Sequence, residues 1–98
     1  MNPLICNAIN EQHLLQLWWE GGARIVQPHA YGINTKGNEM LRCWQVSGYS
    51  RRDGNKKWKP ILVDHAHSFE ILDDTFETHF EYRMNDKHMI QIFAQIVL

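Results

Sequence analysis

The sequence predicts a small, mostly β fold with one short helix at its N-terminus. Two observations predict it: apolar residues recur at helical spacing near the start, and short runs of β-type residues alternate with turn signals in the rest. The chain has 98 residues, of which 44% are hydrophobic, and this fits one modest core. We therefore expect residues 1–98 to form a single domain.

The expected helix opens the chain and runs for about two or three turns, because the apolar positions there follow the helical period. It should cover one end of a sheet. Its apolar positions are Leu4, Ile5, Ala8 and Ile9.

A β-hairpin should follow, because residues 14–19 are rich in apolar and aromatic side chains and stop at Gly21-Gly22. Residues 24–27 are the expected return strand, and they run into Pro28. Proline lacks a backbone N–H, which suits a strand end or a sheet edge better than a central position. We therefore expect this strand to end in a bend at Pro28.

The remaining strands are expected between turn-forming segments, namely residues 34–38 and the polar loop 50–57. The final run, residues 89–98, is nearly all apolar, and its β-branched and aromatic content favours a strand over a short helix. Several short strands with one helix indicate a small β-barrel or sandwich, and a barrel would hide the sheet edges. The expected extended segments are residues 31–33, 40–49, 58–63, 69–72 and 89–98.

Several protein classes fit the sequence poorly. No stretch reaches the roughly 20 apolar residues of a membrane helix, and the N-terminus lacks a signal-peptide pattern, so we expect a cytoplasmic protein with no membrane partner. Cys6 and Cys43 lie among apolar neighbours without metal-type spacing. Each is interpreted as a small buried hydrophobe, and a disulfide between them is not implied.

A cluster of basic residues between positions 51 and 59 is the first candidate site. The formal net charge of the chain is −1, yet this segment carries five cations opposed only by Asp53. Tyr49 and Trp58 flank it, and cations beside aromatic rings suit a nucleotide or single-stranded nucleic acid. The alternative is a solvated hairpin loop with Trp58 buried. The cations are Arg51, Arg52, Lys56, Lys57 and Lys59.

Other polar residues are candidates for anion or metal binding. Arg24, His29 and Arg42 would add anion contacts if the fold brings them together; the alternative for each arginine is a surface position with no partner. His65 and His67 share one face of a strand, but this spacing is more typical of solvent-exposed positions than of a metal site. We expect no bound metal.

The sequence carries no pattern typical of nucleophilic catalysis. Ser47, Ser50 and Cys43 are the candidate nucleophiles, but none lies in a nucleophile-elbow or activated-cysteine context. A small barrel without a deep cleft is also a poor host for a site that must exclude water. We therefore expect no enzymatic activity and no cofactor.

Four stretches stand in an order and spacing typical of a known family, and together they span about residues 5–76. Through them the chain resembles WYL domains, the Sm-like, SH3-type β-barrels of bacterial transcription regulators and defence-associated proteins. The stretches are residues 5–19, Arg24-Ile25-Val26-Gln27-Pro28 with the residues up to 32, residues 43–49, and residues 58–66 with the following 69–76.

The resemblance implies a small Sm-like, SH3-type barrel with a sensor or regulatory role in bacterial transcription regulation. The chain is expected to be a free-standing WYL domain without the helix-turn-helix half of the family. Cys43-Trp44-Gln45 stands where the family has its Trp-Tyr-Leu triplet. Leu62 and His65 stand where the family has two arginines that help to line its proposed ligand groove.

From the sequence we expect a non-catalytic ligand-binding module for a nucleotide or single-stranded nucleic acid. The alternative is a protein-interaction or oligomerisation module that has lost ligand binding. The apolar run 89–98 would need cover on both faces, which favours a homodimer, and a separate regulatory protein is a further candidate partner. The expected ligand-binding residues are Arg24, His29, Arg42, Tyr49, Arg51, Arg52, Lys56, Lys57 and Trp58.

Overall fold

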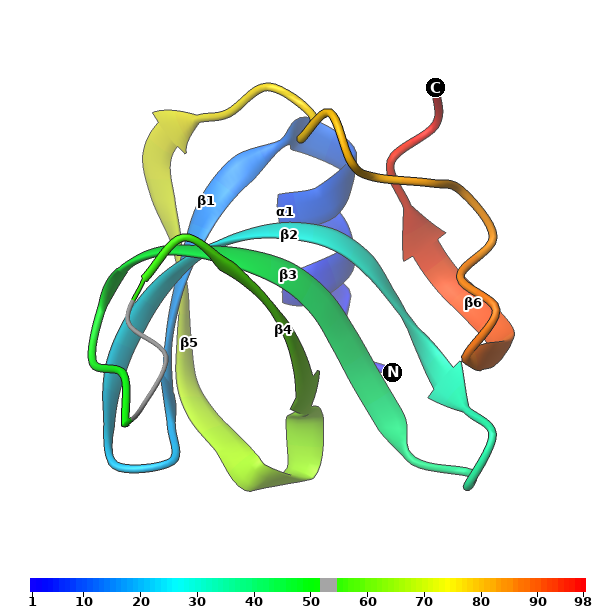
Figure 1. Cartoon of the computed structure of the whole chain (residues 1–98), viewed down its shortest axis with the longest axis horizontal. Helices are drawn as coiled ribbons and strands as arrows, with labels where there is room; N and C mark the ends of the chain where they lie inside the picture. The colour runs from blue at the N-terminus through cyan, green and yellow to red at the C-terminus, as the bar shows by residue number, and fades with distance from the viewer. Residues whose placement is uncertain (52–54) are drawn as a thin grey trace.

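The computed structural model describes residues 1–51 and 55–98. Within these residues the chain forms one α-helix, a short 3₁₀ helix (η1) and six strands (Figure 1). The expectation of a mostly β fold with one short N-terminal helix is confirmed. The elements are α1 (Pro3–Glu11), β1 (His13–Trp19), β2 (Gly22–Asn34), β3 (Glu39–Gly48), β4 (Lys57–Leu62), η1 (Val63–His65), β5 (Ala66–Thr75) and β6 (Met89–Gln95).

The strands form one antiparallel sheet in the order β4-β3-β2-β1-β5, and β6 pairs with the far half of β2. The hairpin at Gly21-Gly22 is confirmed, with Trp19 opposite Gly22. In the described part of the chain this sheet is open, with β4 and β5 as its outer strands. Closure into a barrel therefore stays a prediction.

The expected end of a strand at Pro28 is wrong. β2 continues to Asn34, and Pro28 pairs with Cys43 inside the sheet. A register shift between Pro28 and Ala30 indicates a β-bulge, which is how a sheet interior accommodates a residue without an N–H. β1 pairs with β2 before the bulge, up to Val26, and β6 pairs with it after the bulge, from Ala30. At the bulge the neighbour on this edge of β2 therefore changes from β1 to β6.

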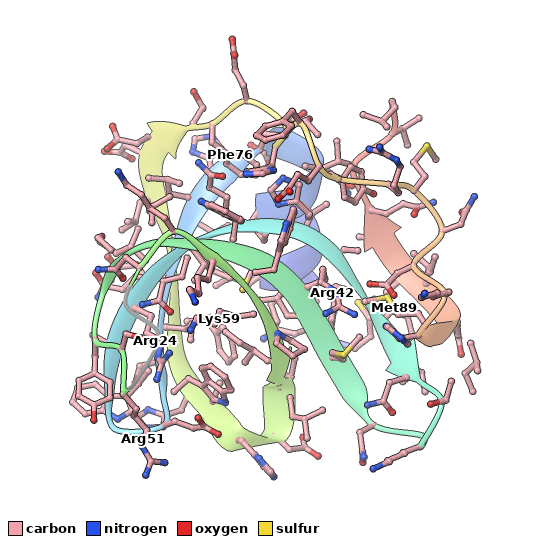
Figure 2. The ribbon with its side chains drawn as sticks, in the orientation of Figure 1. Arg24, Arg42, Arg51, Lys59, Phe76 and Met89 are labelled. Atoms are coloured by element: carbon pink, nitrogen blue, oxygen red, sulfur yellow. The ribbon has the colours of Figure 1, made fainter. Side chains whose placement is uncertain are left out.

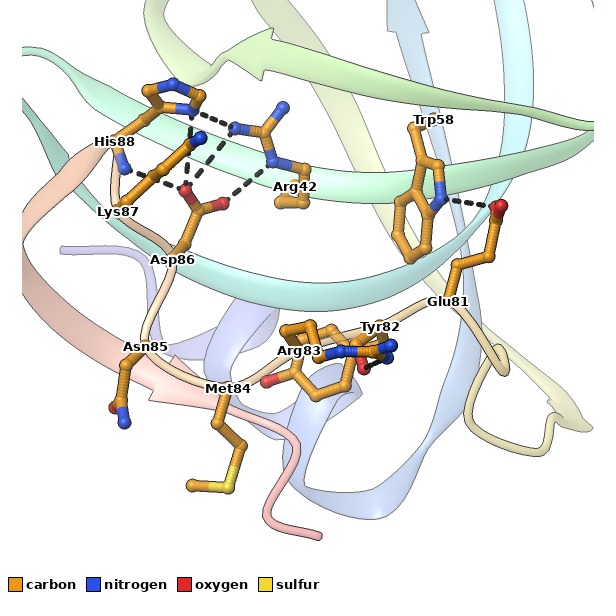
Figure 3. A pocket seen from close by; sticks show the side chains of 10 residues that line it. All are labelled: Arg42, Trp58, Glu81, Tyr82, Arg83, Met84, Asn85, Asp86, Lys87 and His88. Atoms are coloured by element: carbon orange, nitrogen blue, oxygen red, sulfur yellow. Dashed lines mark hydrogen bonds and ion pairs between the residues drawn. The ribbon is translucent and has the colours of Figure 1, made fainter.

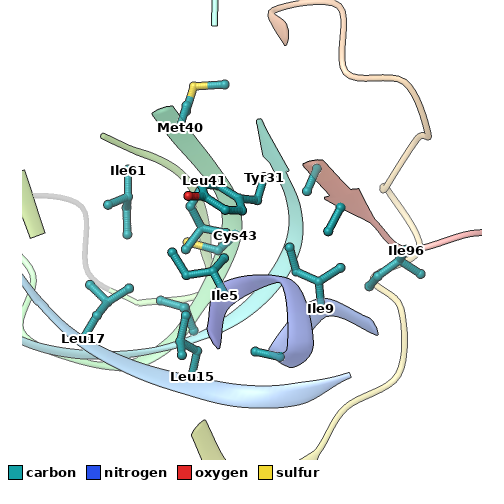
Figure 4. Close-up of a cluster of buried hydrophobic side chains, with 14 of the residues drawn as sticks. Ile5, Ile9, Leu15, Leu17, Tyr31, Met40, Leu41, Cys43, Ile61 and Ile96 are labelled. Carbon is teal, nitrogen blue, oxygen red and sulfur yellow. The ribbon is translucent and has the colours of Figure 1, made fainter. Parts of the chain in front are cut away.

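The core lies between α1 and the inner face of the curved sheet (Figure 4). The Asn2 side chain caps α1 by accepting a hydrogen bond from the Leu4 N–H at 2.9 Å, and the left-handed Gln12 ends it. Cys43 is buried and Cys6 half-buried, both as free thiols. No helix of the described chain is long and apolar enough to cross a membrane. The central core residues include Ile5, Ile9, Leu15, Leu17, Tyr31, Leu41, Cys43 and Ile61.

Candidate functional site

Arg24 is a buried cation at one end of the core. It alternates along β2 with half-exposed Ile25, so its side chain shares the inner face with Val26, and only 2% of it is exposed. The guanidinium lies over the Trp19 ring, 4.4 Å from the ring centroid. Burial lowers the pKa of Arg24, but an arginine remains charged at physiological pH. The fold thus holds a positive charge where a hydrophobic core would normally continue.

Neutral oxygens hold this guanidinium. Its Nε donates to the Trp19 carbonyl at 2.9 Å, one terminal nitrogen donates to Gln45 Oε1 at 3.2 Å, and the other to the Glu20 carbonyl at 3.2 Å. A guanidinium has five N–H donors, and these hydrogen bonds use three of them. The described residues therefore leave two donors for a further acceptor, and an anion would also complement the charge.

Gln45 connects Arg24 to the chain that follows β3. Its side chain is fully buried, and its Nε2 donates to the Tyr49 carbonyl and to Asn55 Oδ1, both at 2.8 Å. Its Oε1 faces Arg24, so one amide group serves both sides. Gln45 thereby links Arg24 to Tyr49 and to Asn55, which lie on either side of positions 50–54 in the sequence.

Tyr49 is held against the Gly21-Gly22 turn. A Cβ atom on either glycine would collide with the Tyr49 side chain, so this turn has to be built from glycine. The Tyr49 N–H also donates to the Ala23 carbonyl at 2.8 Å. This packing directs the next two residues, Ser50 and Arg51, toward Arg24.

A pocket of about 360 Å³ lies beside Arg24. Arg24, Arg51 and Lys59 lie on the same side of the molecule in Figure 2, and all three line this pocket. Lys59 is 7% exposed, and Glu20 is the one acidic residue among the described residues of the lining. The hydroxyl oxygen of Ser50 is buried with no hydrogen-bond partner among the described residues. We call this the Arg24 pocket; its lining is Trp19, Glu20, Arg24, Ser50, Arg51, Trp58, Lys59 and Pro60.

Only some of the expected ligand-binding residues lie at this pocket. Arg24, Arg51 and Trp58 line it, and the half-exposed Tyr49 packs beside it with its ring centroid 5.5 Å from the Arg24 guanidinium carbon. Lys56 and Lys57 are exposed and are not part of its lining. Arg52 lies outside the described residues.

Trp58 is packed rather than presented as an open stacking surface. Its ring lies edge-on to His29, Trp44 and His79, with centroids 4.9, 5.4 and 5.1 Å away. The indole N–H donates to Glu81 Oε1 at 3.2 Å. Of the two aromatics predicted to stack on a base, Tyr49 is therefore the more accessible, with 42% of it exposed.

His29 is fully buried, and its ring packs against those of Trp58, Phe76 and Tyr82. It is not among the residues that line the Arg24 pocket. Its Nδ1 is 2.8 Å from the Gln27 carbonyl, which only accepts, so Nδ1 carries the proton. Its Nε2 accepts the His79 backbone N–H at 3.1 Å. Both ring nitrogens are therefore used to hold the fold.

Arg42 lies in a different pocket, of about 560 Å³, formed against residues 81–88 (Figure 3). Its Nε donates to Asp86 Oδ2 at 2.8 Å. Burial raises the pKa of Asp86, but the hydrogen bonds from Arg42 and from the His88 N–H, together with the charges of these two residues, outweigh burial and leave this pKa below its usual value. The structure therefore separates Arg42 from Arg24 and gives it a carboxylate partner.

Gln45 and Glu20 were missing from the predicted site, and Lys59 was counted in the basic cluster but not among the expected ligand-binding residues. Strand alternation was the available signal for Lys59, since it shares a face with the buried Ile61, whereas the neighbouring Pro60 is exposed. No comparable signal marks Glu20. Its place beside Arg24 depends on the turn after β1, and its backbone carbonyl makes the contact.

The histidines considered for metal binding do not gather ligands in the described chain. His65 and His67 are exposed, and the His67 ring stacks on Trp18 with centroids 6.0 Å apart. No group of three or more His, Cys, Asp or Glu side chains suited to a metal ion is found among the described residues.

Comparisons with protein families, curated proteins and solved structures find no match to this chain. The resemblance to WYL domains therefore stays a prediction.

Proposed function

We propose that the chain is a non-catalytic ligand-binding module whose Arg24 pocket takes a phosphate-bearing ligand, either a nucleotide or single-stranded nucleic acid. One observation carries the proposal. Arg24 is 2% exposed, its guanidinium is held by three neutral oxygens, and it lines a pocket together with Arg51 and Lys59. Burying a charge is unfavourable unless the site is completed by groups that complement it, and a phosphate does so.

Ser50 supports the same ligand chemistry. A buried hydroxyl without a partner costs about 1–3 kcal/mol, and such groups in native proteins often belong to binding sites. A phosphate oxygen is an acceptor for this hydroxyl. Tyr49, half-exposed at the side of the pocket, supplies an aromatic face for the base.

The finer fold assignment, a WYL-like domain of the Sm-like, SH3-type barrel class, belongs to this proposal. Its support is the strand order: β1 to β4 follow one another across the sheet, and β5 returns to β1 with Leu15 opposite Ile71. Closure into a barrel would require only that the two outer strands, β4 and β5, pair with each other. These two strands are connected by η1. A sensor role in bacterial transcription regulation follows from that assignment.

Titration calorimetry with AMP and with an oligothymidylate, at low and moderate salt, tests the function. We expect salt-sensitive binding that Arg51→Gln weakens at least about tenfold, because a phosphate contact is lost. Lys57→Gln makes the same charge change outside the pocket lining and should weaken binding less than about threefold. No binding by the wild type, or equal losses in both variants, would contradict the proposal.

The alternative, a protein-interaction or oligomerisation module, is favoured by a specific observation. Ile90 on β6 is 70% exposed, and Val97 and Leu98 at the end of the chain are 75% and 73% exposed. A second copy packed on this surface would form the expected homodimer. Sedimentation velocity tests it: the alternative requires a dimer that Ile90→Lys dissociates, whereas a wild-type monomer at micromolar concentration would exclude this dimer.

A further inference from the structure

The Arg24 pocket has features that discriminate between kinds of phosphate. Its two most buried cations, Arg24 and Lys59, are 2% and 7% exposed, so an anion reaches them only by entering the pocket. A phosphate within a nucleic acid strand carries a substituent on two of its oxygens, whereas a terminal phosphate carries one. Entry is therefore easier for a terminal phosphate than for one inside a strand.

The charge of the lining favours the same group. Three cationic side chains and one carboxylate line the described part of the pocket. A phosphate monoester carries about 1.5 to 2 negative charges at pH 7, and a diester carries only one. Since Arg24 and Arg51 both line this pocket, the monoester gains more from these cations than the diester does.

Glu20 is placed to exclude a second phosphate. It lies in the turn after β1, its side chain is exposed, and its backbone carbonyl is bound to Arg24. A strand that continued past the bound phosphate on this side would bring its next phosphate toward the Glu20 carboxylate. Like charges at such a site disfavour the longer ligand.

The size of the pocket suits one small ligand rather than a length of strand. Pockets for small molecules range from about 300 to 1,000 Å³, and a volume of about 360 Å³ lies at the lower end of this range. The exposed ring of Tyr49 stands outside the lining, where one base attached to the bound phosphate would lie.

We propose that the Arg24 pocket is specific for a terminal phosphate monoester, supplied by a free mononucleotide or by the 5′ end of a strand, with Glu20 acting against the next phosphate of a strand that continues past the pocket. This inference rests on the proposed function. It narrows the ligand from any nucleotide or single strand to one with a free phosphate end.

Calorimetry with AMP and with its 5′-monomethyl ester tests the specificity, because the two differ only in the esterified oxygen and its charge. We expect AMP to bind at least about tenfold more tightly. To the Glu20→Gln variant, 5′-hydroxyl oligothymidylate, whose phosphates are all internal, should bind at least about threefold more tightly than to the wild type, whereas Glu11→Gln, an equal charge change at the exposed end of α1, should leave this affinity unchanged. Binding of 5′-phosphorylated but not 5′-hydroxyl oligothymidylate would show that strand ends are ligands, and binding of AMP alone would restrict the site to free nucleotides.

The outcomes separate the two proposals. Equal affinity for AMP and its methyl ester, both weakened by Arg51→Gln, would overturn the monoester specificity and leave the proposed function standing. An affinity for 5′-hydroxyl oligothymidylate that Glu20→Gln does not raise would overturn the role of Glu20. Absence of binding by either compound would overturn both proposals.

Discussion

The side chain of His29 and the backbone of His79 are joined by a hydrogen bond of 3.1 Å, with the His79 N–H donating to His29 Nε2. This bond fixes the segment after β5 to the centre of β2, across 50 residues of sequence. The acceptor nitrogen must be unprotonated for the bond to exist. Burial lowers the pKa of His29 to about 4, which keeps the imidazole neutral at physiological pH.

The fold should therefore lose stability in mild acid through His29. The pKa in the unfolded chain is about 6.5, so the unfolded state takes up a proton first as the pH falls. The stabilisation is complete above about pH 6.5 and decreases toward pH 4 by on the order of 3 kcal/mol. Urea unfolding between these pH values measures it. His29→Gln should flatten the dependence, and a variant with an unchanged slope would refute the assignment; His65→Gln, at an exposed position, is the control.

Gln45 should act as a positioning residue for the Arg24 pocket. Gln45→Leu removes the acceptor of one Arg24 hydrogen bond and the donor to the Tyr49 carbonyl, so we expect a loss of about 1–3 kcal/mol in unfolding free energy. The affinity for AMP should also decrease severalfold, although the pocket keeps all its charges. Gln27→Leu, a half-buried position on β2 outside the pocket lining, is the matched control. Wild-type affinity in Gln45→Leu would contradict this role.

Arg42 should contribute to stability and not to ligand binding. Arg42→Gln leaves Asp86 without its cation, and we expect a loss of about 1 kcal/mol for this partly exposed pair. The affinity for AMP should stay within about twofold of the wild type, because Arg42 is not part of the Arg24 pocket lining. Calorimetry and urea unfolding of the same sample give both values. A tenfold loss of affinity for AMP would show that Arg42 takes part in ligand binding.

Gly32 should be required for the pairing of β6 with β2. A Cβ atom at Gly32 would collide with the Gln91 carbonyl oxygen, so Gly32→Ala should cost about 1–3 kcal/mol and loosen β6. Hydrogen exchange would then be faster for the β6 amides than for those of β1. Gly37→Ala is the comparison, because nothing lies near its Cβ position although its φ is +86°. Unchanged protection of β6 in Gly32→Ala would show that the strands pair in another way.

Local patterns in the sequence predicted the elements that depend on local physics. The spacing of Ile5, Ala8 and Ile9 predicted α1, and Gly21-Gly22 predicted the first hairpin. Pro28 misled because proline is disfavoured in central strands, and only the pairing partners of β2 reveal that a bulge accommodates it. The bulge depends on contacts that are distant in the sequence.

The candidate site was predicted in part for the same reason. Charge clustering drew attention to Arg51, but it could not separate Arg51 from Lys57, because that separation depends on how the chain after β3 packs. Arg24, His29 and Arg42 were expected to add anion contacts if the fold brought them together. The structure places Arg24 on the inner face of the sheet and Arg42 against Asp86, a contact across 44 residues. His29 has a similar long-range partner in His79.

The central claim is that a phosphate binds beside Arg24, and the side-chain NMR signal of Arg24 tests it most directly. The Arg24 Nε–H donates to the Trp19 carbonyl at 2.9 Å and is buried, which should slow its exchange with water and make its resonance observable. Titration with AMP should shift this resonance in a saturable way, with the same dissociation constant that calorimetry gives, and Arg51→Gln should weaken that constant. A resonance that stays in place while AMP binds, or a titration with no saturation, would contradict the account.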